Sequence, residues 1–414
     1  MARGQKKIKR YRRIYGGRST LSKVMSAVLA IVVLAGIAGL GWALYDPVSQ
    51  FLSGTMKARE EDSLSSAQEN MSQQESLPAQ APTDLQQETL RLSKVKGVYL
   101  PLSSLQNEEQ LQQTLTQLKA QGINTILIDT KNEQGQVLYQ SSNQTVAEVA
   151  AQVAGAVDLS RITALAKENG MAVIARIYAF RDPISSLILK KAAVKYQDTE
   201  MLWLDDSKEN GGKSWLNPYS EIAQMYIADL SLECIRSGCS AVMLAGVQFP
   251  SGYSLELAGY GTQTKTRQQV LSDFVQDMEE LLQENGGTLI YASSAQALLG
   301  MEASSFDTGG LQYSVKNICP DVRPSSFAGS VRPESLAASS DPAGQPHDTV
   351  KAVMMQLKQS GGNKTFLPML QAYTDPSSAL EYTDLQVKEQ IQALEEVDVT
   401  GYILYNEQGN YPLS

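Results

Sequence analysis

SAVMLAGVQFPSG, at residues 240–252, is an uncharged and largely apolar run that ends in Phe249 and Pro250 before a short Ser-Gly turn. Strands buried on both faces of a parallel sheet have this composition. In barrels of alternating strands and helices, the residues at the carboxyl end of each strand face the ligand. We therefore expect the chemistry of the protein to be visible in this stretch, and it contains no carboxylate.

Apolar runs of the same kind recur after residue 94 and alternate with amphipathic stretches, the pattern of parallel strands joined by crossover helices. A short hairpin is expected near Gly135, leading to 137–139. Helices are expected at 107–120, 158–169, 220–236, 265–284, 348–359 and 384–395. Strands are expected at 95–102, 125–131, 171–180, 240–252, 288–293, 311–318, 365–373 and 401–406. Eight strands predict a closed (β/α)8 TIM-like barrel, with an open doubly wound α/β sheet as the alternative.

The first 45 residues carry a topology signal. Nine of the 35 Lys and Arg residues lie in 1–23, which contains no acid, and 24–45 is uncharged throughout. The length of that apolar segment matches the ~20 residues needed to cross a bilayer. Since basic flanks stay in the cytoplasm, we expect a cytoplasmic tail, a single transmembrane helix and an extracytoplasmic C-terminal domain at the cell membrane. A cleaved signal peptide is the rival interpretation, but its apolar core is usually ~7–15 residues long.

Residues 46–93 are rich in Gln, Ser and Glu and poor in aromatics, so they predict a disordered or partly helical stalk before a folded domain at 94–414. Beyond residue 23 the chain holds 26 basic and 44 acidic residues, a formal charge of −18. A nucleic-acid-binding domain would carry the opposite charge, so we expect no nucleic-acid partner.

The counts of cysteine and histidine exclude several kinds of site. Three cysteines are too few for a disulfide framework, and we expect Cys234, Cys239 and Cys319 to be buried as small apolar residues. His347 is the single histidine and is expected to be solvated at a helix start. One histidine cannot build an H-E-x-x-H zinc site. No metal or cofactor is therefore predicted.

Polar side chains at the ends of the predicted strands are the candidates for a site. Asp129, Lys131 and Arg176 form either an ion-pair network that closes the barrel mouth or a polar ligand site. Trp203 and Trp215 either stack on sugar rings or pack the long loop after the third strand. The complete set of ligand-binding candidates is Tyr99, Lys131, Arg176, Trp203, Trp215, Gln248, Arg323, Gln371 and Asn406.

Seven short motifs occur in one order between residues 96 and 410. With the family's form in parentheses, they are Lys96-Gly97-Val98-Tyr99 (R/K-G-I-Y); Ile128-Asp129-Thr130-Lys131-Asn132 with Gly135 (I-D-x-K-D-D-x-G); Ala175-Arg176-Ile177 with Arg181-Asp182-Pro183 (A-R-I, K-D-P); Trp215-Leu216-Asn217-Pro218-Tyr219 (W-x-D/N-P-Y); Gln248-Phe249-Pro250 (F-D-Y-V-R-F-P); Pro320 with Pro324-Ser325 (S-P-M-x-Y-P-S-H); and Leu370-Gln371-Ala372-Tyr373 (L-Q-D/A-F). In these motifs the chain resembles a family of glycosyl hydrolase domains of unknown function. Its members are glycoside-hydrolase-like TIM barrels, often secreted or membrane-anchored in bacteria.

The chain departs from the family pattern where acids are expected. Ala245 stands at the aspartate of the fourth strand and Gln248 at its arginine, while Ser293 stands at the aspartate of the fifth strand. The Tyr and His of Y-P-S-H fall on Arg323 and Ser326. Glycoside hydrolysis ordinarily needs two carboxyl groups, and Ala, Gln and Ser cannot replace them.

Three functions remain open. The favoured one is a catalytically degenerate barrel that binds a cell-envelope glycan or a protein partner. The second is an active glycosidase acting on a cell-wall or extracellular polysaccharide, for which Asp129, Asp182 and Asp321 are the candidate acid and nucleophile. The third is a scaffold of an envelope complex that contacts no glycan.

Overall fold

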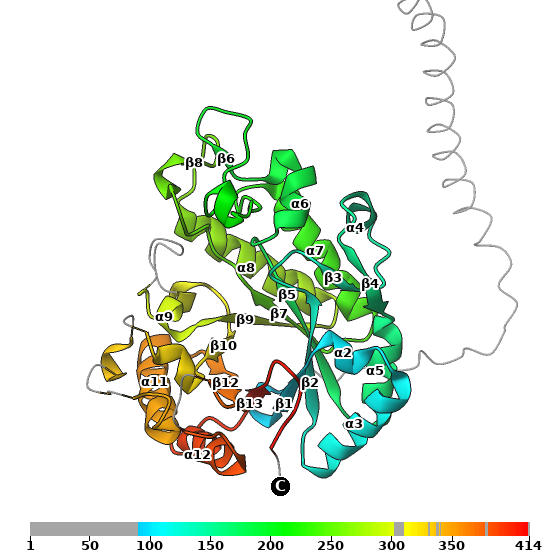
Figure 1. Cartoon of the computed structure of the whole chain (residues 1–414), viewed down its shortest axis with the longest axis vertical. Helices are drawn as coiled ribbons and strands as arrows, with labels where there is room; N and C mark the ends of the chain where they lie inside the picture. Colours follow the sequence, from blue (N-terminus) through cyan, green and yellow to red (C-terminus); the bar gives the residue numbers. More distant parts are fainter. Residues whose placement is uncertain are drawn as a thin grey trace, which may run out of the picture. The chain divides into compact units, whose positions relative to one another are not determined.

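A closed ring of parallel strands forms the centre of the structure, a computed structural model that describes residues 90–301, 310–329, 332–336, 339, 341–376 and 380–412 (Figure 1). Each strand pairs in parallel with the next, and the last returns to the first. In order, the ring consists of β1 (Lys96–Leu100), β2 (Thr125–Lys131), β5 (Ala172–Tyr178), β7 (Ala241–Ala245), β9 (Thr288–Ser294), β10 (Asn317–Asp321), β12 (Met369–Gln371) and β13 (Tyr402–Tyr405). These eight strands, counted among the described residues, confirm the predicted TIM-like barrel.

Helices follow most of the strands and cover the outside of the ring (Figure 1). The long ones are α3 (Glu108–Ala120), α5 (Leu159–Glu168), α7 (Glu221–Arg236), α8 (Arg267–Glu284), α11 (Pro346–Gly361) and α12 (Asp384–Glu395). The short ones are α2 (Leu102–Leu105), α4 (Gln144–Glu148), α6 (Pro183–Ile188) and α9 (Ala295–Leu298), with single 3-10 turns at Leu92–Lys94, Lys190–Ala192, Lys208–Asn210, Leu255–Leu257, Gly310–Gln312, Pro324–Phe327 and Glu334–Leu336.

Two layers of apolar side chains hold the barrel together. Leu127, Ile174 and Met243 belong to a cluster inside the ring, and every one of them is fully buried. Helix residues that recur every three or four positions, such as Leu111 and Leu115 of α3, pack against the outer face of the strands. Alternate residues of a strand therefore enter the two layers in turn, because the side-chain period of a strand is two.

Three strand predictions were wrong in position, length or number. The strand expected at 240–252 ends already at Ala245, as β7. The strand expected at 311–318 lies at 317–321 (β10), because 310–312 forms a 3-10 turn instead. The single strand expected at 365–373 is divided into β11 (Thr365–Phe366) and β12. Pro368 lies between them, and a proline has no N–H for the sheet.

The predicted hairpin near Gly135 is confirmed and extends further than expected. β2 pairs in antiparallel fashion with β3 (Val137–Tyr139), which pairs in turn with the unpredicted β4 (Gln152–Val157). Glu233 of α7 fixes this extension by accepting hydrogen bonds from the Tyr139 and Ser141 hydroxyls, at 2.6 and 2.5 Å, and from the N–H and hydroxyl of Ser142. Burial acts to raise the pKa of Glu233, but these hydrogen bonds outweigh it and hold the pKa below its usual value.

The segment between β5 and α7 rises above the ring and carries α6 and β6 (Lys195–Tyr196) (Figure 1). β6 pairs in antiparallel fashion with β8 (Ala258–Gly259), which belongs to the connection between β7 and α8. In a separate apolar cluster, Trp203, Trp215 and Val194 of the segment before α7 pack with Ala258 of β8.

The predicted cytoplasmic tail, the predicted transmembrane helix at 24–45 and nearly all of the predicted stalk lie outside the described residues. Among the helices that are described, none combines the length and the apolar composition needed to cross a bilayer. At the boundary, Leu92 is already buried with the interior of the barrel, two residues before the predicted start of the domain.

Candidate functional site

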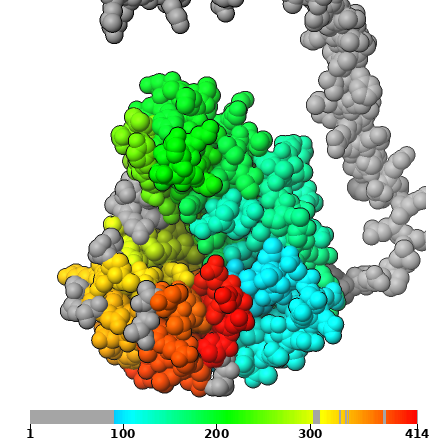
Figure 2. Space-filling view, in the orientation of Figure 1, coloured from blue at the N-terminus to red at the C-terminus, as the bar shows by residue number. Residues whose placement is uncertain are grey.

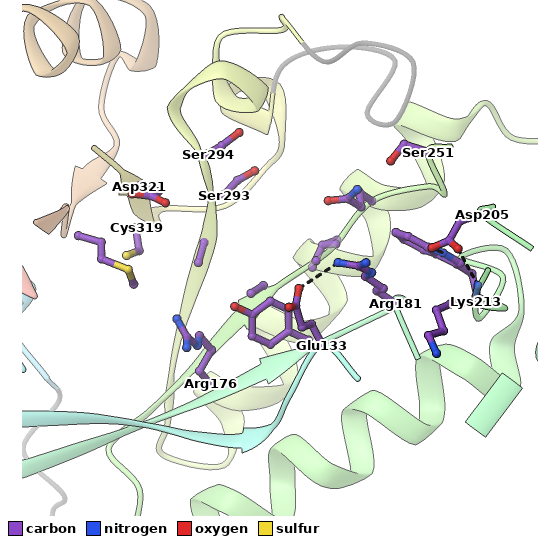
Figure 3. A pocket seen from close by; sticks show the side chains of 18 of the residues that line it. Glu133, Arg176, Arg181, Asp205, Lys213, Ser251, Ser293, Ser294, Cys319 and Asp321 are labelled. Atoms are coloured by element: carbon purple, nitrogen blue, oxygen red, sulfur yellow. Dashed lines mark hydrogen bonds and ion pairs between the residues drawn. The ribbon is translucent and has the colours of Figure 1, made fainter. Parts of the chain in front are cut away.

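A cleft of about 720 Å³ opens at the carboxyl ends of the barrel strands (Figure 3). We call it the mouth cleft. The ends of β5, β7, β9, β10, β12 and β13 form its lower part, and residues 205–215 of the segment above the ring form its upper part. Cys319 and Asp321 lie on one side of it, and Asp205 and Lys213 lie on the other (Figure 3). This position is the one at which barrels of this class bind ligands.

The floor of the mouth cleft is uncharged. Ala245, Ala292, Cys319 and Met369 line it from four neighbouring strands, and each is at most 8% exposed. Burial raises the pKa of the Cys319 thiol to about 12, so this group is protonated and unreactive at neutral pH. The position where the fourth-strand aspartate was expected is therefore an alanine whose methyl group faces the cleft.

Asp129 and Arg176 form one ion pair at the edge of this floor. Arg176 donates from Nε and Nη2 to the two carboxylate oxygens of Asp129 at 2.5 and 3.0 Å, and the Tyr99 hydroxyl donates to Asp129 at 3.0 Å. The Arg176 guanidinium carbon lies 5.0 Å from the Tyr99 ring centre and 5.7 Å from that of Tyr405. Burial acts to lower the pKa of Arg176, but Asp129 outweighs it and raises the pKa well above its usual value. Both oxygens of Asp129 are thus engaged.

Asp321 and Arg323 form a second pair of the same kind, beside the same Tyr405 ring. The Arg323 side chain donates to Oδ1 and Oδ2 of Asp321 at 2.9 and 2.6 Å. Its guanidinium carbon lies 4.6 Å from the Tyr405 ring centre. The two side chains are 24% and 23% exposed, so the pair lies at the surface of the cleft, where a ligand can reach it.

Sequence reasoning missed the acidic residues that loops bring to the cleft. Glu133 pairs with Arg181 at 3.0 Å (Figure 3), and Asp205 accepts hydrogen bonds from the Lys213 N–H at 2.6 Å and from the Trp215 indole at 3.0 Å. Asp206 also lines the cleft and accepts from the Ser207 N–H. Glu133 had a signal in the sequence, since it occupies the place of the third aspartate in I-D-x-K-D-D-x-G. Asp205 and Asp206 reach the cleft only because the long segment between β5 and α7 folds back over the ring, and no sequence pattern indicates this.

Lys131 and Asp182 do not belong to the site, so their assignments as ligand-binding and catalytic candidates were wrong. Lys131 Nζ lies 3.1 Å from Asp182 Oδ2, and both side chains are fully buried. The same ammonium donates to the Tyr178 carbonyl at 2.6 Å, while Asp182 Oδ1 accepts from the Ser185 N–H and caps α6. A carboxylate enclosed in this way cannot reach a glycosidic bond.

Two more ligand-binding candidates are buried by structural contacts. Trp203 is fully buried and its indole N–H donates to the Ser254 carbonyl at 3.0 Å, so its ring has no face for a sugar. Gln371 is also fully buried, where it accepts from the Ser325 N–H and donates to the Tyr373 carbonyl. Both assignments were wrong, because interior packing uses these side chains.

The other candidates lie at or near the cleft. Arg176, Trp215, Gln248 and Arg323 line it, and Tyr99 stacks on the cleft residue Tyr405 at 4.9 Å between ring centres. Asn406 lies in a neighbouring cleft and donates to the Ala372 carbonyl at 2.9 Å. As expected, Cys234, Cys239 and Cys319 are buried thiols. Within the described ranges no group of acids, cysteines and histidine has the arrangement of a metal site.

Comparisons with known proteins give a family and several similar solved structures. A family model described as "Putative glycosyl hydrolase domain" matches residues 97–411. A search of curated proteins gave no match. Among solved structures, a hypothetical protein from Ruminiclostridium thermocellum is 24% identical, with a TM-score of 0.42 over 47% of this chain and 96% of that chain.

Two structures of enzymes that act on glycans are also similar. The glycoside hydrolase domain of PelA from Pseudomonas aeruginosa is 12% identical, with a TM-score of 0.37 over 77% of this chain and 96% of that one. A cycloisomaltooligosaccharide glucanotransferase from a Paenibacillus species is 11% identical, with a TM-score of 0.45 over 71% of this chain, which spans only 40% of the enzyme.

Proposed function

The chain belongs to the family of putative glycosyl hydrolase domains, and from that premise we propose that its barrel binds a cell-envelope glycan in the mouth cleft without hydrolysing it. One observation carries the proposal. In the described part of the chain, the carboxylates that line the cleft, Glu133, Asp205, Asp206 and Asp321, already hold hydrogen bonds or an ion pair within the protein. Hydrolysis needs one carboxyl group that donates a proton and a second that attacks or activates water.

The same cleft has the chemistry that sugar binding requires. Arginine fork donors and acidic acceptors suit the many hydroxyl groups of a sugar, and aromatic rings supply flat apolar faces. Arg176, Arg323 and Tyr405 offer these groups side by side at the edge of the uncharged floor. Ala245 and Ser293 stand where the family pattern has aspartates, but the arginines, the tyrosine and the remaining acids of the cleft can still bind hydroxyl groups. Binding therefore fits the cleft better than catalysis does.

Hydrolysis is the second candidate, and the presence of both Asp321 and Glu133 in one cleft favours it. In that case the ion pairs to Arg323 and Arg181 would have to open when substrate binds. Asp321 and Asp129 remain the candidate acid and nucleophile from the sequence, with Glu133 added by the geometry.

We expect the full chain to be retained on at least one insoluble glycan from a panel of peptidoglycan, chitin, cellulose and cross-linked polygalacturonate, and to release no reducing sugar from it. The measurement is a pull-down followed by an assay of reducing ends, and Asp321→Asn is the matched variant. Sugar release by the unmodified chain that Asp321→Asn abolishes would establish hydrolysis instead. Failure to bind any glycan would favour the scaffold role with a protein partner.

We also propose that residues 24–45 anchor the barrel outside the cell membrane, on the evidence of nine basic residues followed by an uncharged segment. A reporter fused after Ser414 is expected to be active only if it is an enzyme that functions outside the membrane. Activity of a reporter that functions only in the cytoplasm would contradict the anchor.

A further inference from the structure

A second cleft of about 760 Å³ adjoins the mouth cleft, and nothing above assigns it a role. We call it the C-terminal cleft, because residues 405–412 provide much of its lining together with 372–376. Figure 2 shows the C-terminal residues (red) at the surface of the molecule, between the part drawn in orange and the part drawn in cyan. Volumes of this size are typical of ligand-binding pockets, so each of the two clefts is large enough to hold part of a ligand.

Internal hydrogen bonds give the C-terminal cleft a fixed shape. The Tyr411 hydroxyl donates to the carbonyls of Tyr99 and Leu404, which holds the end of the chain against β1 and β13. Asn406 donates to the Ala372 and Asn410 carbonyls at 2.9 and 2.6 Å. A preformed cleft costs less ordering entropy when a ligand binds than a loop that must fold at that moment.

The two clefts share a wall. Arg323 and Tyr405 line both of them, and the Arg323 guanidinium lies 4.6 Å from the centre of the Tyr405 ring. Asp321 takes the donors on Nε and Nη2 of Arg323, so other N–H groups of this guanidinium remain for a ligand. A single extended molecule can therefore contact the same wall from both sides.

The lining of the C-terminal cleft is aromatic and mostly uncharged. Its aromatic members are Tyr373, Tyr382, Tyr405 and Tyr411, and its amides are Asn406, Gln408 and Asn410. Flat rings beside amide donors and acceptors match the faces and hydroxyl groups of sugars. Among the described residues, its charged lining residues are one arginine and one glutamate, Arg323 and Glu407.

The charges of the mouth cleft also balance. Its four acidic residues are matched by four basic ones, Arg176, Arg181, Lys213 and Arg323. Arg176, Arg181 and Arg323 each pair with a carboxylate. Neither cleft therefore has an excess of positive charge with which to attract a polyanion, and the formal charge of −18 beyond residue 23 would repel one.

We infer that the C-terminal cleft is a second sugar subsite, so that the ligand is a linear oligosaccharide of neutral sugars that passes from the mouth cleft over Arg323 and Tyr405. This inference rests on the proposed glycan binding and adds to it the length and the charge of the ligand.

The test uses the full chain and oligomers of two and six sugar units, prepared from whichever neutral polysaccharide of the panel retains it, with titration calorimetry as the measurement. The hexamer is expected to bind about tenfold more tightly than the dimer, because only the hexamer reaches both clefts. Tyr373→Ala removes a ring of the C-terminal cleft and is expected to lower hexamer affinity about tenfold, the usual order for one aromatic contact in a binding site. Tyr253→Ala is the matched control, since Tyr253 is 62% exposed and lines neither cleft.

The outcomes separate this inference from the function on which it rests. Equal affinity for dimer and hexamer would overturn the second subsite and leave glycan binding intact, whereas retention on no glycan would remove the proposed function itself. Preferential binding of polygalacturonate would overturn the neutral ligand. Should Tyr373→Ala fail to fold, Gln408→Ala tests the same cleft, because the hydrogen bond that fixes this residue comes from its backbone N–H. A folded double variant, Tyr373→Ala with Gln408→Ala, that binds the hexamer as tightly as the unmodified chain does would contradict the inference.

Discussion

Replacing Lys131 by alanine is expected to lower the free energy of unfolding by about 3–5 kcal/mol, because it leaves the Asp182 carboxylate in the core without its partner. Both side chains are fully buried and their charged atoms lie 3.1 Å apart. The pair also joins two segments of the barrel mouth, since Lys131 ends β2 and Asp182 caps the N-terminus of α6. The measurement is denaturation by guanidinium chloride, followed through the fluorescence of the buried Trp203 and Trp215.

Two controls decide whether burial of the charge causes the loss. Lys265→Ala breaks an ion pair to Asp273 whose side chains are 58% and 47% exposed, so the free energy of unfolding is expected to change little. The double variant Lys131→Met with Asp182→Asn removes both charges and keeps an oxygen that can cap α6, so it is expected to be more stable than Lys131→Ala. A loss below about 1 kcal/mol for Lys131→Ala would show that the pair contributes little.

Arg323→Ala is expected to weaken glycan binding about a hundredfold, the largest effect on binding that the geometry predicts. Arg323 lies in the wall between the two clefts, and hydrogen bonds from a charged donor contribute about 1.5–3 kcal/mol each. Arg323→Lys is expected to recover only part of the affinity, because an ammonium lacks the planar fork that engages Asp321 with two hydrogen bonds. Affinity for the hexamer, measured by calorimetry, gives the result.

Arg161→Ala is the matched control for this prediction, since Arg161 also pairs with a carboxylate, that of Glu108, but lines neither cleft. Unchanged affinity in Arg323→Ala would remove the shared wall from the binding site. Release of reducing sugar by Arg323→Ala, but not by the unmodified chain, would instead identify Asp321 as an acid that the ion pair restrains.

The sequence predicted most of the barrel because its strands are buried on both faces and stand out as apolar runs. The prediction failed where this signal is weak. β10 contains Asn317, Pro320 and Asp321, which are poor strand formers. The strand was therefore predicted too early in the sequence, over residues 311–318, which include Leu311, Tyr313 and Val315. β4 is only partly buried, and its sequence, Gln-Val-Ala-Gly-Ala-Val, does not alternate between apolar and polar residues as a half-buried strand does.

The position of the candidate site could be predicted from the sequence, but which polar side chains pair with one another inside the protein could not. The rule that strand ends face the ligand placed Arg176, Gln248 and Arg323 correctly beside the mouth cleft. The same rule included Lys131 and Gln371, which end strands but turn into the protein interior. Whether a polar side chain faces solvent or the core depends on contacts between distant segments, such as that of Lys131 with Asp182, and these leave no local pattern.

The pairing of β1 with β13 has a consequence for how the protein is made. Lys96 lies beside Tyr402 and Val98 beside Leu404, so one edge of β1 has no partner until β13 has been synthesised, some 300 residues later. Until then a growing chain presents two open strand edges, one at β1 and one at the newest strand, and such edges invite pairing with other chains. A chain emerging from a ribosome or an export channel must therefore be protected from aggregation until its final strand has arrived.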